Sequence, residues 1–140
     1  MSQRPFKILG IEHVGVAVES MEGISEIFSG IFGLNFIGSE EVKDQQVISD
    51  IFEIGKSKLE FLKPTNVDSP IARFVGKQGI GLHHIALLVD NLQAALDYIK
   101  DQGIQLLDES PRIGAKGLSI AFLHPKSTGG ILIELCEKKE

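Results

Sequence analysis

The stretch GIGLHHIALLVD (residues 79–90) decides the fold of this chain, because an earlier stretch repeats its pattern. Residues 82–99 read LHHIALLVDNLQAALDYI, and residues 11–28 read IEHVGVAVESMEGISEIF. Both begin with apolar residues at alternate positions, as a half-buried strand does, and both continue with apolar residues at helical spacing. Aligning the two stretches places His84 on His13.

A later pair of stretches continues the repeat. IGKSKLEFLK (54–63) aligns with TGGILIELCE (128–137), which places Glu60 on Glu134. Weak identity with a shared pattern is typical of duplicated structural units. Each half of the chain therefore carries one histidine and one glutamate at corresponding positions.

The repeat predicts an α+β fold in which two βαβββ modules form one curved mixed sheet around a metal cavity. We expect a single domain over residues 1–140, with module one at about 8–64, a connecting helix at about 68–78 and module two at about 80–137. Besides the strand that opens each module, strands are expected near 47–54, 58–63, 104–109, 118–123 and 130–136.

Three helices are predicted from their end signals and apolar stripes. The first would follow the N-cap Ser20 and stop at Gly33, and the second would follow Asn91 and stop at Gly103. Ser69 would cap the connecting helix. The stripes comprise Met21, Ile24, Ile27, Phe28, Ile31 and Phe32 in the first helix, Leu92, Ala95, Leu96 and Ile99 in the second, and Ile71, Phe74 and Val75 in the connecting helix.

Composition excludes several classes of protein. A net charge of −5 argues against nucleic acid as the main partner. The apolar runs are too short to span a membrane, and the N-terminal MSQRPFKILG lacks a hydrophobic targeting core. The single cysteine, Cys136, fits a reducing compartment. We therefore expect a cytoplasmic protein. An anionic small-molecule substrate stays open as an alternative and would need a local basic patch.

Strand parity separates the two adjacent histidines. Neighbouring side chains of a strand point to opposite faces, so His83 and His84 have different environments. The face that carries His84 and its counterpart His13 has mainly small neighbours, which leaves room inside a curved sheet. We predict that His13 and His84 point inward, and that His83 and its counterpart Glu12 lie at the rim.

Glu60 and Glu134 each interrupt an apolar strand. A buried carboxylate is costly unless a partner or a metal compensates it. Two imidazoles and two carboxylates from His13, Glu60, His84 and Glu134 would offer nitrogen and oxygen ligands to one divalent ion, such as cobalt, zinc, nickel, manganese or iron. The competing interpretation is a metal-free network of buried ion pairs.

These residues resemble a known superfamily. Paired modules with one His and one Glu each are similar to the vicinal oxygen chelate fold. The stretches IEHVGVAV, LEFLKPTNVDSPIARFV, GLHHIALLVDNLQAAL and FLHPKSTGGILIEL resemble, more specifically, the methylmalonyl-CoA epimerase family. HPKSTGG, just before Glu134, is the most discriminating of these, because glyoxalase I usually has a DPDGY-type turn there.

The resemblance implies both a reaction and a site. The metal ligands would be His13, Glu60, His84 and Glu134, with Glu60 the loosest because some relatives have Gln there. The reaction would interconvert the 2R and 2S epimers of methylmalonyl-CoA, in propionate metabolism, by removing the α-proton and stabilising an enolate through the metal. Glu134 would act as the catalytic acid/base, and a homodimer is expected.

The chain departs from the family pattern at the second acid/base. The family mechanism is often drawn with a second carboxylate on the strand after a QG-like turn. Here that region reads DQQVISD, and the matching position is Ser49, with Asp50 adjacent but of opposite parity. Ser49 could relay a proton through water, or Asp50 could enter if the strand bulges.

A turn and a loop of the second half could bind the substrate's anionic groups. Lys126, Ser127, Thr128 and Gly129 form a turn whose amides and cation could hold a carboxylate or phosphate; the alternative is a turn with no ligand. The loop PRIGAKG (111–117), with two cations, could cover the opening or contact the nucleotide.

Two alternatives remain open. One is another enzyme of the superfamily, either a glyoxalase I-type lactoylglutathione lyase or a ring-cleaving dioxygenase. The other is a metal-free small-molecule-binding relative, such as an antibiotic-sequestering protein. Only 6% of the residues are aromatic and none is Trp, which disfavours an aromatic-lined binding cavity.

Overall fold

The computed structural model describes residues 3–139 and separates into two compact units. The N-unit comprises His13–His83, and the C-unit comprises Met1–Glu12 together with His84–Glu140. The chain passes between the units inside two strands, once after Glu12 and once after His83. The N-unit contains most of predicted module one and the connecting helix, and the C-unit contains most of module two.

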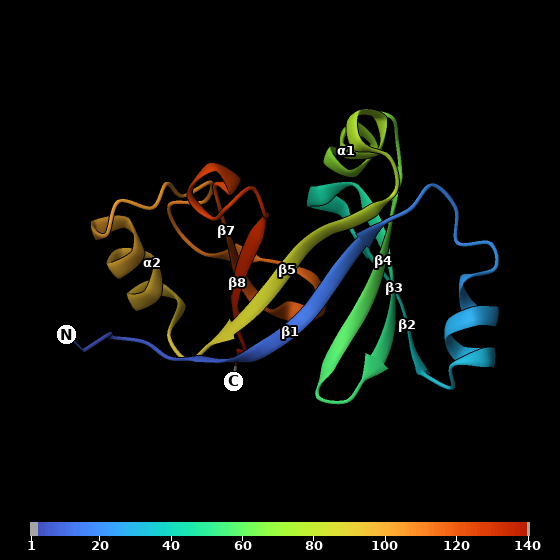
Figure 1. Cartoon of the computed structure of the whole chain (residues 1–140), viewed down its shortest axis with the longest axis horizontal. Helices are drawn as coiled ribbons and strands as arrows, with labels where there is room; N and C mark the ends of the chain where they lie inside the picture. Colours follow the sequence, from blue (N-terminus) through green and yellow to red (C-terminus); the bar gives the residue numbers. More distant parts are fainter. Residues whose placement is uncertain (1–2, 140) are drawn as a thin grey trace. The chain divides into compact units, whose positions relative to one another are not determined.

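The N-unit is built from four strands (Figure 1). Its elements are β1 (Ile8–Ala17, from His13 onward), the π-helix η1 (Glu26–Ile31), β2 (Asn35–Val42), the short 3-10 helix η2 (Lys43–Gln45), β3 (Val47–Ile54), β4 (Ser57–Pro64) and α1 (Pro70–Gln78). The strands are ordered β2-β3-β4-β1. β1 and β4 are parallel, and β3 is antiparallel to both of its neighbours.

The C-unit repeats this arrangement. Its elements are β5 (Gly81–Val89, from His84 onward), α2 (Leu92–Asp101), β6 (Arg112–Ile113), η3 (Ala115–Gly117), β7 (Ser119–Leu123), η4 (Pro125–Ser127) and β8 (Ile133–Glu137). The strands are ordered β5-β8-β7-β6, with β5 and β8 parallel and the other pairs antiparallel. In both units the first strand pairs with the last, so the predicted α+β fold of two βαβββ modules is confirmed.

Two of the three predicted helices form with their predicted caps. Ser69 Oγ accepts a hydrogen bond from Ala72 N at 2.9 Å at the start of α1, and Asn91 Oδ1 accepts one from Ala94 N at 3.0 Å at the start of α2. Each bond satisfies an amide that has no partner within its helix. The predicted stop near Gly103 is also confirmed.

The first predicted helix is largely wrong. The structure has only the six-residue π-helix η1, in which the amide of Phe32 bonds the carbonyl of Ile27 at 2.9 Å. The wider π turn rotates the stripe, so Phe28 packs inward while Ile31 and Phe32 are 75% and 62% exposed. Gly33, at φ 77°, does end the segment as predicted.

The strand predictions need two corrections. β2 was not predicted, and the expected strand at 104–109 reduces to one isolated bridge between Leu106 and Leu123. The amides of Leu107 and Asp108 both donate to the carbonyl of Phe122, so the ladder cannot continue there. The strand at this edge of the C-unit is β6, which begins three residues after Glu109 and contains only Arg112 and Ile113.

Each unit has apolar core clusters on both faces of its strands. In the C-unit, Leu92, Ala95 and Leu96 of α2 pack on Val89 and Leu135, and Figure 1 shows α2 beside β7 and β8. A core cluster of the N-unit joins residues of β1, β3, β4 and the η1 segment, namely Val16, Val18, Phe52, Leu59, Phe61, Met21, Ile24 and Phe28, with Leu34. The bulky strand faces therefore lie under α2 and the η1 segment, as parity predicts. The prediction is wrong for α1, whose residue Ile71 packs with Ala17 and Leu62 on the face that carries His13 and Glu60.

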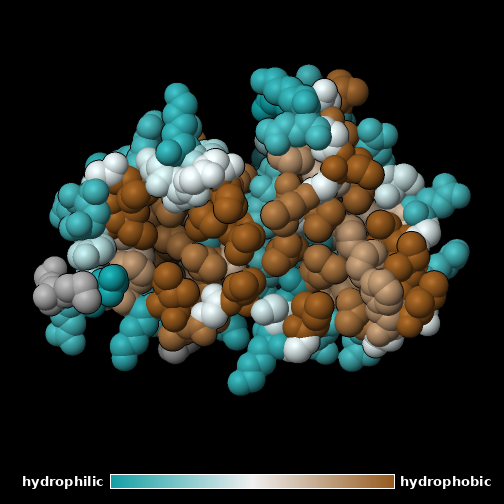
Figure 2. All heavy atoms as spheres, in the orientation of Figure 1, coloured by the Kyte–Doolittle hydropathy of each residue, from teal (hydrophilic) through white to brown (hydrophobic). Residues whose placement is uncertain are grey.

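Part of the apolar surface is exposed. Figure 2 shows apolar side chains across the displayed face of the chain. Large exposed residues of the N-unit include Ile31, Phe32, Phe36 and Ile37. Within residues 3–139, no helix is long and apolar enough to cross a membrane.

Candidate metal centre

The first candidate pair lies in the N-unit. His13 is on β1 and Glu60 is on the parallel strand β4, where Glu60 is the register partner of Gly15. His13 Nδ1 lies 3.4 Å from Glu60 Oε2. Both residues are buried, with exposures of 3% and 2%.

The second candidate pair lies in the C-unit and repeats the strand register of the first, although a different imidazole nitrogen faces the carboxylate. His84 is on β5, Glu134 is on the parallel strand β8, and the register partner of Glu134 is Ala86. His84 Nε2 lies 3.3 Å from Glu134 Oε1, and both residues are buried. In each unit the carboxylate thus stands opposite the residue two places after the histidine. The predicted correspondence of the two halves holds at the level of strand register.

The parity prediction is correct for the histidines and wrong for Glu12. His83 is only partly buried and packs edge-on against Phe74, with ring centroids 4.8 Å apart. Glu12, its counterpart, is only 5% exposed, and its Oε1 lies 3.1 Å from Lys116 Nζ. A carboxylate this deeply buried needs a cation, and Lys116 provides one, so Glu12 is not a rim residue.

Ser49 and Asp50 lie on opposite faces of β3. Ser49 is 1% exposed, and its hydroxyl donates to Glu60 Oε1 at 3.3 Å. Asp50 Oδ1 instead accepts a bond from Ser39 Oγ at 2.6 Å. The β3–β4 register is continuous, so no bulge turns Asp50 toward Glu60. Of the two residues, Ser49 is the one that contacts a candidate ligand.

The turn after β7 satisfies most of its own polar groups. The amides of Ser127, Thr128 and Gly130 donate to carbonyls at the start of the turn, and the amide of Lys126 donates to His124 Nδ1. Ser127 Oγ accepts from Gln105 N, and Thr128 Oγ1 donates to the carbonyl of Ile131. The turn therefore has a structural role, whether or not it also binds an anion.

Both cations of the 111–117 loop are engaged inside the C-unit. Lys116 pairs with Glu12, and Arg112 Nε lies 3.1 Å from Asp108 Oδ1. Gly114 fits closely against Ile120, whose Cδ1 would lie 2.7 Å from an added Cβ. These contacts tie the segment to its own unit.

Sequence reasoning missed Phe122, which borders the second pair. Phe122 on β7 is the register partner of Glu134, and its ring packs edge-on against the imidazole of His84 at 5.7 Å. The alternation of SIAFL, with Phe122 on the same face as Ile120, was the available signal. It could not be used without knowing which residue of β8 stands opposite.

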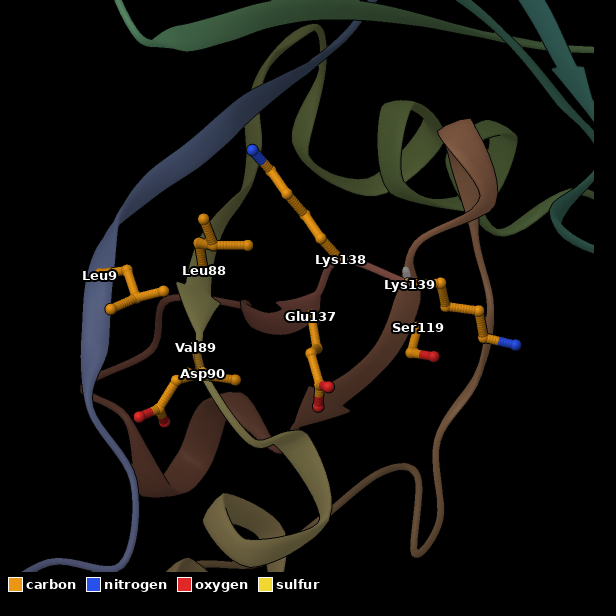
Figure 3. Close-up of a pocket in the computed structure, with 8 residues that line it drawn as sticks. All are labelled: Leu9, Leu88, Val89, Asp90, Ser119, Glu137, Lys138 and Lys139. Carbon is orange, nitrogen blue, oxygen red and sulfur yellow. The ribbon is translucent and has the colours of Figure 1, made fainter.

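A pocket in the C-unit contains neither His84 nor Glu134 (Figure 3). Its volume is about 670 Å³, and its lining includes the carboxylates of Asp90 and Glu137. Asp90 Oδ1 accepts a bond from the amide of Lys7, and Glu137 Oε1 accepts one from the amide of Leu92 at the start of α2. Because both carboxylates hold the backbone, this pocket is not a candidate catalytic site.

The donor set of the two pairs fits a divalent transition metal. Each unit offers one imidazole nitrogen and one carboxylate oxygen from buried residues that could bind an ion. Nitrogen and oxygen donors without thiolate suit cobalt, zinc, nickel, manganese or iron. The residues present are therefore chemically suited to the metal that the sequence predicts.

Duplicated βαβββ units with a buried His–Glu pair in each define the class of protein. A family model described as the Glyoxalase/Bleomycin resistance protein/Dioxygenase superfamily matches residues 12–122. The match includes His13, Glu60 and His84, and it ends before Glu134.

Individual relatives narrow the class. The chain is 43% identical over 129 residues to the uncharacterized protein YqjC of Bacillus subtilis, covering 92% of each chain. It is 37% identical over 126 residues to the mitochondrial methylmalonyl-CoA epimerase of Homo sapiens, covering 89% of this chain and 72% of that one. A variant of the Streptomyces coelicolor methylmalonyl-CoA epimerase, solved in complex with 2-nitronate-propionyl-CoA, superimposes with a TM-score of 0.89 at 32% identity, covering 94% of this chain and 96% of that one.

The chain belongs to this superfamily and, within it, to the family of relatives named methylmalonyl-CoA epimerase. Enzymes with that name are isomerases. The resemblance stated from the sequence is therefore confirmed for the family.

Proposed function

We propose that this protein is a metal-dependent methylmalonyl-CoA epimerase that binds one divalent ion through His13, Glu60, His84 and Glu134. The main support is the shared register of the two His–Glu pairs, each carboxylate standing opposite the residue two places after its histidine. The named relatives and the acyl-CoA analogue bound by the Streptomyces coelicolor enzyme support the substrate class.

The N–O distances within the two pairs are longer than those of tight ion pairs. Charge-assisted bonds between nitrogen and carboxylate oxygen are about 2.7–2.9 Å long. The two pairs are looser, at 3.4 and 3.3 Å, and both are buried. The burial of both carboxylates supports a bound cation, which would offset the cost of removing their charge from water. When bound, the ion would supply a Lewis acid that lowers the energy of negative charge on a carbonyl oxygen.

Glu134 is the proposed acid/base. The proton between the thioester and the carboxylate is weakly acidic, and its removal places negative charge on the thioester oxygen. A carboxylate of Glu134 accepts this proton on one face of the carbon. Burial at 4% exposure keeps bulk water away from the carboxylate, and His84 orients it.

The opposite face requires a proton from another group. Ser49 is the proposed participant, because its hydroxyl contacts Glu60 while Asp50 is bonded to Ser39. A water held by Ser49 would exchange protons with solvent. Inversion would therefore carry solvent hydrogen into the product.

The proposed anion-binding turn for the substrate consists of Lys126, Ser127, Thr128 and Gly129. Since the hydroxyls of Ser127 and Thr128 are engaged within the C-unit, the ammonium of Lys126 is the principal contact proposed.

A homodimer is also proposed, supported by the exposed apolar residues of the N-unit. A role in propionate metabolism and a cytoplasmic location stay predictions, as does the single-domain organisation.

The decisive assay follows (2S)-methylmalonyl-CoA in deuterated water, with metal-stripped and Co²⁺-loaded protein. We expect epimer interconversion with deuterium at the α-carbon, and only in the loaded sample. No interconversion with any of the candidate metals would refute the proposed function. Metal-dependent consumption of the methylglyoxal–glutathione hemithioacetal would instead identify a glyoxalase I-type lyase.

A further inference from the structure

We propose that Phe122, braced by Arg112, is a positioning residue that fixes the orientation of the His84–Glu134 pair. This inference rests on the proposed function for the role of that pair as metal ligands. Phe122, Arg112 and Asp108 all lie in the C-unit, and the proposed reaction assigns none of these three residues a role.

Phe122 lies against both members of the pair. It is the register partner of Glu134 in the antiparallel β7–β8 ladder, where opposite side chains have Cβ atoms about 4.5–5.5 Å apart. Its ring meets the imidazole of His84 edge-on, with centroids 5.7 Å apart and planes at 81°. This edge-to-face geometry is favourable for two aromatic rings. The contact limits rotation of the imidazole about its Cβ–Cγ bond.

Arg112 and Asp108 also contact Phe122. The guanidinium carbon of Arg112 lies 5.6 Å from the Phe122 ring centroid, within cation–π range. Asp108 Oδ1 lies 3.1 Å from Arg112 Nε, and Asp108 Oδ2 accepts a bond from the backbone amide of Phe122 at 2.8 Å. The carboxylate of Asp108 therefore contacts both the guanidinium of Arg112 and the backbone amide of Phe122.

The N-unit has no aromatic side chain at the equivalent place. The β3 residue opposite Glu60 is Ile51, and the polar neighbour of Glu60 is Ser49. The aromatic support therefore belongs to the pair that contains the proposed acid/base. Outer contacts that orient a metal ligand typically change metal affinity by about 10–100-fold when they are removed.

Cobalt affinity tests the role of the ring. We expect Phe122→Leu to weaken Co²⁺ binding to the full chain about tenfold or more by calorimetry. Phe122→Tyr, which keeps the ring, should stay within about threefold of wild type. Phe52→Leu, which removes a fully buried ring of the N-unit core, is the matched control for lost packing and should leave the Co²⁺ affinity unchanged.

Arg112→Met supplies a variant that keeps the ring and its packing. We expect Co²⁺ binding to weaken about threefold, as for loss of a cation–π contact. Unchanged affinity in both Phe122→Leu and Arg112→Met would overturn the positioning role. Loss of affinity in Phe52→Leu equal to that in Phe122→Leu would also overturn it, because general destabilisation would then account for both.

A crystal structure of metal-free Phe122→Leu separates this inference from the proposed function. If the ring positions the pair, the His84–Glu134 contact should be broken or the imidazole rotated. A pair retained at 3.3 Å, as in the wild-type structure, would refute the positioning role. Failure of the wild-type protein to bind Co²⁺ would refute the proposed metal site, and the crystal structure would then decide the positioning role alone.

Discussion

The two His–Glu pairs share a backbone register but differ in their surroundings. Glu60 stands opposite Gly15, and Glu134 stands opposite Ala86. The N-unit pair is bordered by the hydroxyl of Ser49, whereas an aromatic ring borders the C-unit pair. Duplication has thus kept the strand pairing that sets where the ligands stand, while the side chains around them have diverged. We expect the two pairs to contribute unequally to catalysis and to metal binding.

The largest difference should appear between the two carboxylates. Glu134→Gln should lower kcat about 10³-fold, since it removes the proposed acid/base. Glu60→Gln should instead weaken Co²⁺ affinity about tenfold and leave kcat at saturating metal within about tenfold of wild type. Steady-state epimerisation with metal titration checks both. Equal losses of kcat would contradict the assignment of the acid/base to Glu134.

The histidines provide the next test. His84→Ala should weaken Co²⁺ binding about 100-fold or more, because it removes a ligand, while His83→Ala should change it by less than about twofold. Calorimetric titration of the two variants gives the comparison. His83 packs on Phe74 in the N-unit, so its loss should affect only stability.

The stability of the protein should depend on the ion pair between the buried carboxylate of Glu12 and Lys116. Lys116→Met leaves the buried carboxylate of Glu12 without this cation, and we expect it to cost about 2 kcal/mol in the free energy of unfolding. Urea unfolding is the measurement. Lys100→Met, which breaks an exposed ion pair with Glu109, is the matched control and should leave the midpoint nearly unchanged. A Lys116→Met midpoint equal to that of the control would show that Glu12 is adequately solvated.

The smallest effect is expected at Ser49. Ser49→Ala removes one hydrogen bond to Glu60 and should cost about 1 kcal/mol in the free energy of unfolding. If its hydroxyl also holds the proposed relay water, kcat should fall by more than the loss in the free energy of unfolding can explain. Asp50→Asn, on the other face of β3, should leave kcat unchanged. A reversal of these two effects on kcat would place the second proton path at Asp50.

Local sequence was sufficient for much of the fold. The caps Ser69 and Asn91 precede α1 and α2 as predicted. A side-chain oxygen just before an amphipathic run accepts a hydrogen bond from an amide of the first turn that has no partner within the helix. Local rules failed at η1, where the π turn inserts an extra residue per turn. They also failed at 104–109, where two amides converge on the carbonyl of Phe122.

What the sequence by itself determined is the duplication and the face on which each candidate ligand lies, since alternation along a strand is a local property. Only the tertiary structure decided which residues meet: Glu60 with Ser49, Glu12 with Lys116, and Phe122 with His84. The last two contacts join segments far apart in the chain, whereas Ser49 and Glu60 are 11 positions apart on the adjacent strands β3 and β4. Their partners are set by strand register, which depends on how whole apolar faces pack, and no short stretch of sequence contains that information.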